Sequence, residues 1–164
     1  VNEVTAILFN KYDSLIKLKE ADIKDIEEII KPIGTYKKKS IFLHDIVTKL
    51  VENNCIVPND RKFLESLPGV GRKTVNVFLS NIYNEPFIAV DTHVERVSKR
   101  LGLAKQNDDV YKVEKKLERK IPKEKRAKAH HQLVLFGRYH CKAKNPSCIN
   151  CKLKEICKNK TKTI

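Results

Sequence analysis

The sequence lacks several residue types and patterns that would point to particular classes of protein. It has no methionine and no tryptophan, and only five glycines and six prolines occur in 164 residues. No run of 18 apolar residues is present, and the first twenty residues lack a basic stretch followed by an apolar run and a small-residue cleavage site. We therefore expect no membrane-spanning helix, no secretory leader and a cytoplasmic location. Because the chain begins with valine, we also expect it to be processed or to be a fragment of a longer product.

Basic residues greatly outnumber acidic ones. The chain has 34 Lys and Arg against 20 Asp and Glu, a formal net charge of +14, and its 41% share of hydrophobic residues is that of a globular protein. Such an excess of positive charge suits a partner rich in phosphate, so nucleic acid is the leading candidate. Frequent lysine could also reflect codon bias, so the motifs must decide.

Helical periodicity dominates the chain, and no convincing strand alternation is present. In the first part, the apolar residues at helical spacing are Val4, Ile7 and Leu8, then Ile23, Ile26, Ile29 and Ile30, then Ile41, Ile46, Val47 and Leu50. Helix breakers separate these stretches at residues 32–34, 53–58, 67–71 and 84–86. Further helices are expected at 108–119 and 127–136, and the spacing of Thr92 and Glu95 predicts a capping box that starts a helix just after Asp91. The sequence therefore predicts an all-α fold.

A glycine-containing turn, residues 67–74 (LPGVGRKT), lies between helical runs at 60–66 and 72–80. Gly69 and Gly71 allow a positive φ and a close approach of the backbone, which would expose N–H groups at the start of the second helix. Such a helix start binds a phosphate oxygen without reading base sequence. On the glycines alone, an ordinary tight turn between two helices is the alternative.

Four of the five cysteines are crowded into 17 residues near the C-terminus. Their spacing is Cys141-x6-Cys148-x2-Cys151-x5-Cys157, whereas Cys55 stands apart and is interpreted as a small loop or core residue. In a reducing compartment, such a cluster favours metal over disulfides. Spacing alone leaves open whether the group is a tetrahedral zinc or an iron-sulfur cluster.

Residues 67–74, 88–93 (IAVDTH) and 137–139 (GRY) resemble the endonuclease III family of DNA glycosylases and AP lyases. The resemblance implies a helix-hairpin-helix glycosylase fold with two helical lobes. The first, 1–85, would carry the hairpin at about 60–80 and be incomplete at its N-terminus. The second, 86–164, would carry a C-terminal [4Fe-4S] loop, with the active site between the lobes. The family pattern also implies a DNA-backbone contact through Gly69, Val70, Gly71 and Arg72, and cluster ligation by Cys141, Cys148, Cys151 and Cys157.

Lys73 and Asp91 occupy the catalytic positions of the family. Lys73 lies at a helix start beside Arg72, and both features disfavour a second cation, so we expect its amine to lose a proton readily and act as a nucleophile. By resemblance, Asp91 stabilises cationic character at C1′ of the nucleotide and relays a proton. Glu65 matches an acidic residue at the family's pocket, although an exposed helix acid is an equally simple interpretation.

The function implied by the resemblance is base excision repair. The enzyme would bind double-stranded DNA as a monomer, flip an oxidised pyrimidine out of the stack, remove it, and cut the strand 3′ to the abasic site by β-elimination through a lysine Schiff base. A bacterial protein of this kind would be associated with the nucleoid. Two alternatives remain open: a non-enzymatic hairpin module that binds DNA and uses zinc as a staple, and a glycosylase that releases a base without cutting.

Other positions show where the chain follows the family and where it departs from it. The loop after Cys141 offers Lys142 and Lys144 to the DNA backbone, and His93 is expected to contact the strand or a phosphate. Thr35 stands where the family often has a leucine wedge, which weakens that role. The family's opening helix and a segment with a gap-filling glutamine are expected to be missing. The adjacent histidines 130 and 131 are interpreted as helix residues between core and surface.

Overall fold

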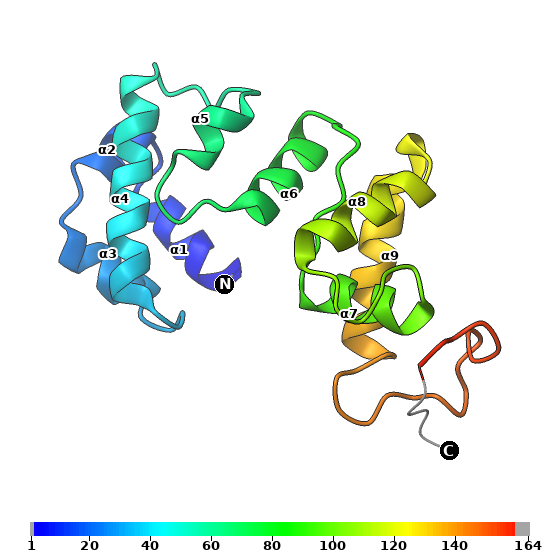
Figure 1. Cartoon of the computed structure of the whole chain (residues 1–164). Helices are drawn as coiled ribbons and strands as arrows, with labels where there is room; N and C mark the ends of the chain where they lie inside the picture. The colour runs from blue at the N-terminus through cyan, green and yellow to red at the C-terminus, as the bar shows by residue number, and fades with distance from the viewer. Residues whose placement is uncertain (1, 160–164) are drawn as a thin grey trace. The chain divides into compact units, whose positions relative to one another are not determined.

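The computed structural model describes residues 2–159, which contain helices, turns and bends and no strand (Figure 1). The predicted all-α class is confirmed. The chain forms two compact units, residues 1–71 and 72–164. The predicted lobe boundary at 85/86 lies further along the chain and remains a prediction. None of the described helices is both long enough and apolar enough to cross a membrane.

The helices follow the predicted stretches closely. In the first unit they are α1 (Asn2–Lys11), α2 (Leu15–Lys19), α3 (Ile23–Ile30), α4 (Tyr36–Glu52) and α5 (Arg61–Glu65). In the second they are α6 (Arg72–Ile82), α7 (Thr92–Leu101), α8 (Val110–Lys120), a 3-10 turn (Lys123–Lys125) and α9 (Arg126–Tyr139). The sequence did not predict α2, because five residues are too few to show a helical period.

The first unit has its own apolar core. Its buried residues are Val4, Leu8, Leu18, Ile26, Ile30 and Val47, and α4 packs against α2 and α3. A polar contact joins the end of α1 to α3, since the Tyr12 hydroxyl and the Lys11 ammonium both donate to Asp25. The hydrogen bond from Lys11, and next the one from Tyr12, lower the pKa of Asp25. The hydrogen bond between Tyr12 and Asp25 also raises the pKa of Tyr12 to about 12.

The second unit combines an extended segment with the four α-helices α6 to α9. Its buried core comprises Ile88, Val90, Val94, Ala104, Val113 and Leu117. The main packing is between α7 and α9, which meet at Gly137. An added Cβ at Gly137 would lie 2.8 Å from the Cβ of His93, so the absence of a side chain allows the close approach of the two helices.

The start of α7 differs in one respect from the prediction. The N-cap is Asp91, whose side chain accepts a hydrogen bond from the Val94 amide at 2.8 Å. The predicted capping box of Thr92 and Glu95 is therefore wrong, and Glu95 pairs instead with Lys99 at 2.6 Å. The helix begins where it was predicted, because an Asp one position earlier supplies the same kind of acceptor.

Candidate active site

The turn before α6 owes its shape to one of its two glycines. Gly69 has a φ of 71°, and an added Cβ would lie 2.4 Å from Cδ2 of Phe42. Gly71 is not among the positive-φ glycines, and nothing lies within 4 Å of a Cβ built on it. The left-handed conformation predicted for the pair is therefore confirmed for Gly69 alone, whereas the close approach of this backbone to a phosphate stays a prediction.

Lys73 lies in the first turn of α6 and is exposed. Among the described residues its side chain forms no hydrogen bond or ion pair, so its amine faces solvent. Its neighbour Arg72 is engaged within the second unit, donating from Nε and Nη2 to Glu114 at 2.6–3.1 Å. The start of α6 thus holds its arginine fixed while its lysine is accessible.

Asp91 and Lys73 lie within electrostatic reach of one imidazole, that of His130 on α9. Burial lowers the pKa of His130 below its usual value, and His131 and Lys73 lower it further. A backbone hydrogen bond with Ala89 and the charge of Asp91 raise it. The charges of Lys73 on α6 and of Asp91 at the start of α7 therefore both act on the His130 imidazole of α9. The Nδ1 atom of His130 is buried there and has no partner within the described chain.

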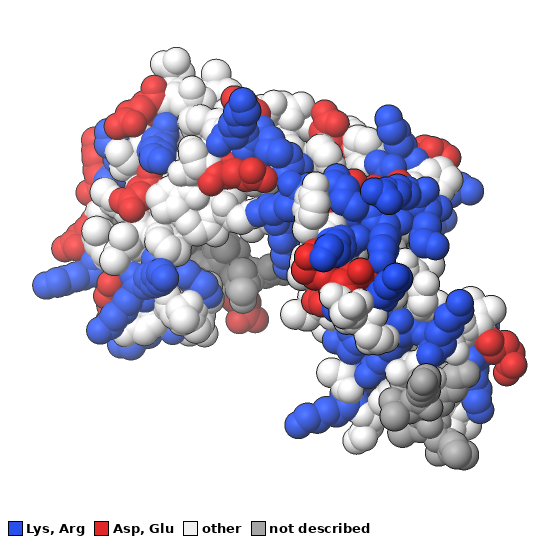
Figure 2. All heavy atoms as spheres, viewed as in Figure 1, with Lys and Arg blue, Asp and Glu red and all other residues white. Residues whose placement is uncertain are grey.

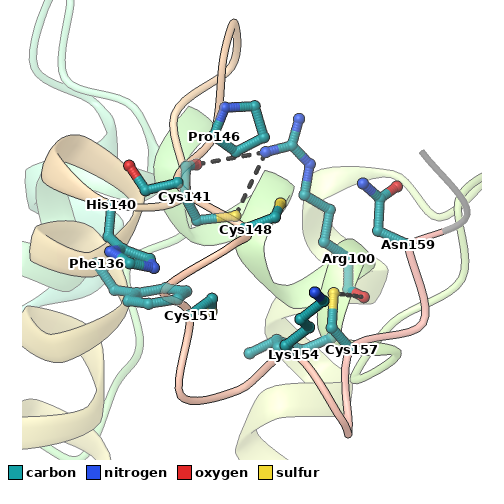
Figure 3. Close-up of a pocket in the computed structure, with 12 residues that line it drawn as sticks. Arg100, Phe136, His140, Cys141, Pro146, Cys148, Cys151, Lys154, Cys157 and Asn159 are labelled. Carbon is teal, nitrogen blue, oxygen red and sulfur yellow. Dashed lines mark hydrogen bonds between the residues drawn. The ribbon is translucent and has the colours of Figure 1, made fainter. Parts of the chain in front are cut away.

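The cysteine-rich segment forms a pocket at the end of α9 (Figure 3). All four cysteines, each half-buried, line this pocket together with Phe136, and its empty volume of about 420 Å³ is partly open to solvent. Within residues 2–159, no three His, Cys, Asp or Glu side chains lie close enough together to hold one metal ion. The donors are thus four thiols arranged around a common space.

Two arginines of α7 hold this segment in place. Arg100 donates from Nη1 to the Cys141 sulfur at 3.3 Å (Figure 3). The same nitrogen also donates to the Lys142 carbonyl at 2.7 Å. Arg96 donates to the Cys141 and Gly137 carbonyls at 3.1 and 2.7 Å. The loop with Lys142 and Lys144 is therefore fixed at its base, and both lysines are exposed.

Residues 1–123 match the model of the HhH-GPD superfamily of base excision DNA repair proteins. The chain belongs to this superfamily. It is 46% identical over 159 residues to Endonuclease III of Bacillus subtilis (strain 168), and the aligned region covers 96% of this chain and 73% of the relative. It is 40% identical over 163 residues to Endonuclease III of Escherichia coli (strain K12), which covers 99% of this chain and 77% of the relative.

Solved structures agree with this HhH-GPD assignment. A trapped endonuclease III–DNA covalent intermediate, an estranged-adenine complex, superposes with a TM-score of 0.92 at 46% identity, covering 96% of this chain and 74% of the other. A thermostable thymine-DNA glycosylase, at 22% identity and a TM-score of 0.86 over 96% of this chain and 75% of the other, shows the same fold. The resemblance inferred from the motifs is confirmed, and a non-enzymatic module is not favoured.

The remaining predicted positions of this HhH-GPD chain have varied surroundings. His93 is half-buried on α7, with Nδ1 3.2 Å from Nη2 of Arg96. Glu65 ends α5 in the first unit and pairs with Arg61 at 2.9 Å, so its pocket role stays a prediction.

Thr35 precedes α4 with a φ of 61° and is exposed, and Cys55 is an exposed loop residue. His130 is half-buried and His131 exposed, which confirms their interpretation as helix residues between core and surface.

Sequence reasoning missed three residues that shape the site: Arg96, Arg100 and Glu114. The two arginines are four residues apart on α7, a spacing that places them on one face. Glu114 lies between Val113 and Leu117 on the apolar stripe of α8 and is only 2% exposed. A charged residue at a core position of a helical pattern was the available signal, but its partners could not be read from it.

Basic residues gather over the face of the second unit where α8 lies (Figure 2). This helix contributes Lys112, Lys115, Lys116, Arg119 and Lys120. Three of these lysines pair with acids of the same region, namely Asp109, Glu118 and Asp108. Their charge is therefore partly neutralised by these ion pairs.

Proposed function

We propose that this chain is a DNA glycosylase with lyase activity, which removes oxidised pyrimidines from double-stranded DNA and cuts the strand 3′ to the resulting abasic site. The carrying observation is Lys73, which is exposed in the first turn of α6, two residues after the LPGVG turn, and whose charge, like that of Asp91, acts on His130. The 46% identity to a protein captured as a covalent intermediate with DNA supports this proposal.

Binding is assigned to the turn and to the loop after Cys141. Gly69, Val70, Gly71 and Arg72 would line the backbone contact, and the N–H groups of Gly69, Gly71 and Arg72 would donate to phosphates, as helix starts do. The Val70 N–H donates to the Leu67 carbonyl at 3.1 Å, and the Arg72 guanidinium is paired with Glu114. Lys142, Lys144 and His93 would contact the strand from the second unit. The protein would bind DNA as a monomer and act in the compartment that holds the DNA.

The chemistry begins when the damaged nucleotide leaves the stack, because C1′ is inaccessible in an intact duplex. The neutral amine of Lys73 forms a bond to C1′ while the bond from C1′ to the base breaks, and the base leaves with the electron pair and takes up a proton. Asp91 stabilises positive charge at C1′ and relays the proton. The sugar ring opens to an iminium, loss of a C2′ proton expels the 3′ phosphate, and water releases the lysine.

The four cysteines are assigned to a [4Fe-4S] cluster. Four thiols around one apolar pocket fit this group better than a single zinc, because each thiolate can ligate its own iron, whereas zinc needs all four sulfurs about 2.3 Å from one point. When bound, the cluster would supply structural cross-linking rather than a chemical step. It would hold Cys141 and its loop, with Lys142 and Lys144, against the Arg100 side chain.

Borohydride trapping tests this function. The protein is incubated with a duplex containing thymine glycol or an abasic site, reduced, and examined for a covalent protein–DNA adduct. We expect an adduct with the unaltered protein and none with Lys73→Ala, because borohydride reduces the imine between the Lys73 nitrogen and C1′ to a stable amine link. Lys128→Ala, which removes another exposed lysine of the same unit, is the matched control and should retain the adduct.

Two results would contradict the proposal. An undiminished adduct with Lys73→Ala would remove the assigned nucleophile. A colourless, folded protein whose DNA binding depends steeply on salt but shows neither an adduct nor a preference for lesions would instead support the non-enzymatic module.

A further inference from the structure

Glu114 is a carboxylate in the core of the second unit. It is 2% exposed, and its neighbours Val113 and Leu117 on α8 are fully buried. A carboxylate at such a position is costly unless it is paired and hydrogen-bonded. Its partners therefore indicate why the residue is there.

The first partners lie on either side of Lys73. Arg72 donates from Nε to both carboxylate oxygens at 3.1 and 3.0 Å, and from Nη2 to Oε1 at 2.6 Å. Asn76, one helical turn further along α6 and fully buried, donates to Oε2 at 3.0 Å. Glu114 thus fixes two points, one turn apart, of the helix that carries Lys73.

The same network reaches the segment that leads to Asp91. The side-chain nitrogen of Asn76 also lies 3.3 Å from the carbonyl oxygen of Ile88, to which it donates. Ile88 is fully buried and stands three residues before Asp91. On the other side, the Arg72 guanidinium stacks over the Tyr111 ring at 4.9 Å. One carboxylate therefore joins α6, α8 and the approach to α7.

We propose that Glu114 is a positioning residue that holds Lys73 and Asp91 in register with each other. An ion pair with a buried carboxylate contributes little stability compared with apolar residues of the same size, and here the Arg72 side chain is 38% exposed. A shift of about 1 Å in a reacting group, by contrast, can cost about 100-fold in rate. The ion pair between Arg72 and Glu114 therefore contributes mainly by placing Lys73 and Asp91, not by stabilising the fold. The inference rests on the proposed function, since Lys73 and Asp91 are its catalytic residues.

Glu114→Gln preserves the volume of the side chain but removes the negative charge that pairs with the Arg72 guanidinium. Under single-turnover conditions with an abasic duplex, we expect strand cleavage to slow by about 10- to 100-fold, while Kd for a duplex with a tetrahydrofuran abasic analogue changes by less than about threefold. This analogue cannot form an imine, so its Kd reports binding alone. If the substitution only lowered stability, the folded protein below its unfolding temperature would cleave at the unaltered rate and bind with the unaltered Kd. A slower rate at an unchanged Kd therefore reports positioning.

Asp108→Asn is the matched control. Asp108 is a carboxylate of the same unit, 7% exposed, paired with Lys116 at 2.5 Å and accepting from the Lys105 amide, and these partners lie outside α6. Both variants are assayed at a temperature where circular dichroism shows each to be fully folded. Equal cleavage rates for Glu114→Gln and Asp108→Asn would overturn the proposal. If Glu114→Gln does not fold, Asn76→Ala takes its place, and an unchanged rate would overturn it equally.

Lys73→Ala separates this inference from the function on which it rests. If the unaltered protein forms the borohydride adduct, Lys73→Ala does not, and Glu114→Gln cleaves like the control, only the positioning role fails. If the unaltered protein forms no adduct, the function and the positioning role both fail.

Discussion

At the scale of single residues, Gly69 is the position of the hairpin turn where the backbone itself is constrained. We expect Gly69→Ala to lower the free energy of unfolding by about 1–3 kcal/mol, because a side chain would have to adopt the left-handed region and displace the ring of Phe42. The added Cβ would lie 2.4 Å from that ring, and the φ of 71° disfavours any L side chain. Urea unfolding followed by circular dichroism measures this change.

Gly71→Ala is the control for the same turn. Nothing lies within 4 Å of its added Cβ, so its effect should stay within about 0.5 kcal/mol. Equal losses at both glycines would show that the turn tolerates neither substitution for a reason other than the geometry at Gly69. Affinity for DNA should also fall with Gly69→Ala, because the N–H groups of the turn would move.

Residues with a local signature could be predicted from the sequence, and those defined by a distant partner could not. Lys73 follows a recognisable turn, and the four cysteines have a spacing that is typical of a metal or cluster site. Glu114 is 42 positions away from Arg72, and Arg100 is 41 positions away from Cys141. Such pairs meet only when the helices have packed, so no pattern in either segment announces them. The helix cap moved from Thr92 to Asp91 because both side chains can accept the same bond.

At the scale of helix pairs, the contact of α7 with α9 depends on Gly137. Helix propensity alone predicts that Gly137→Ala stabilises α9 by about 0.5–1 kcal/mol, whereas overpacking costs about 1–3 kcal/mol. The obstructing atoms include the Cα and Cβ of His93, at 3.2 and 2.8 Å, which cannot rotate away. We therefore expect a net loss of stability in urea unfolding. Gln132→Ala, at an exposed position of α9, should change little, and a gain with Gly137→Ala would contradict the packing argument.

The polar contact between α1 and α3 makes stability depend on pH. The pKa of Asp25 is lowered by its bonds from Lys11 and Tyr12, so the folded state favours the ionised carboxylate. Its contribution is present above the ordinary pKa of 3.8 and is lost as the pH falls through the lower folded value. The stability difference between the unaltered protein and Asp25→Asn should thus be constant from about pH 7 to 5 and shrink below about pH 4.

Urea unfolding at several pH values gives this difference directly. Asp13→Asn removes an exposed acid paired with Lys17 at 2.9 Å, and it serves as the matched control with a small effect at every pH. A difference for Asp25→Asn that grows toward low pH would show that the carboxylate is protonated in the folded state.

At the scale of the whole molecule, the net charge of +14 favours binding to any DNA. A salt titration can identify which lysines contact the phosphates directly. We expect Lys142→Ala with Lys144→Ala to reduce the slope of log affinity against log salt concentration by up to about 1.8, because each phosphate contact releases about 0.9 counterion. Lys17→Ala with Lys31→Ala removes the same charge from exposed pairs with Asp13 and Glu28 and should leave the slope unchanged. Fluorescence anisotropy titrations at several salt concentrations measure both slopes. Equal slopes for the two double variants would mean that the loop after Cys141 contributes only to the general field, and the assignment of its lysines to the DNA backbone would fail.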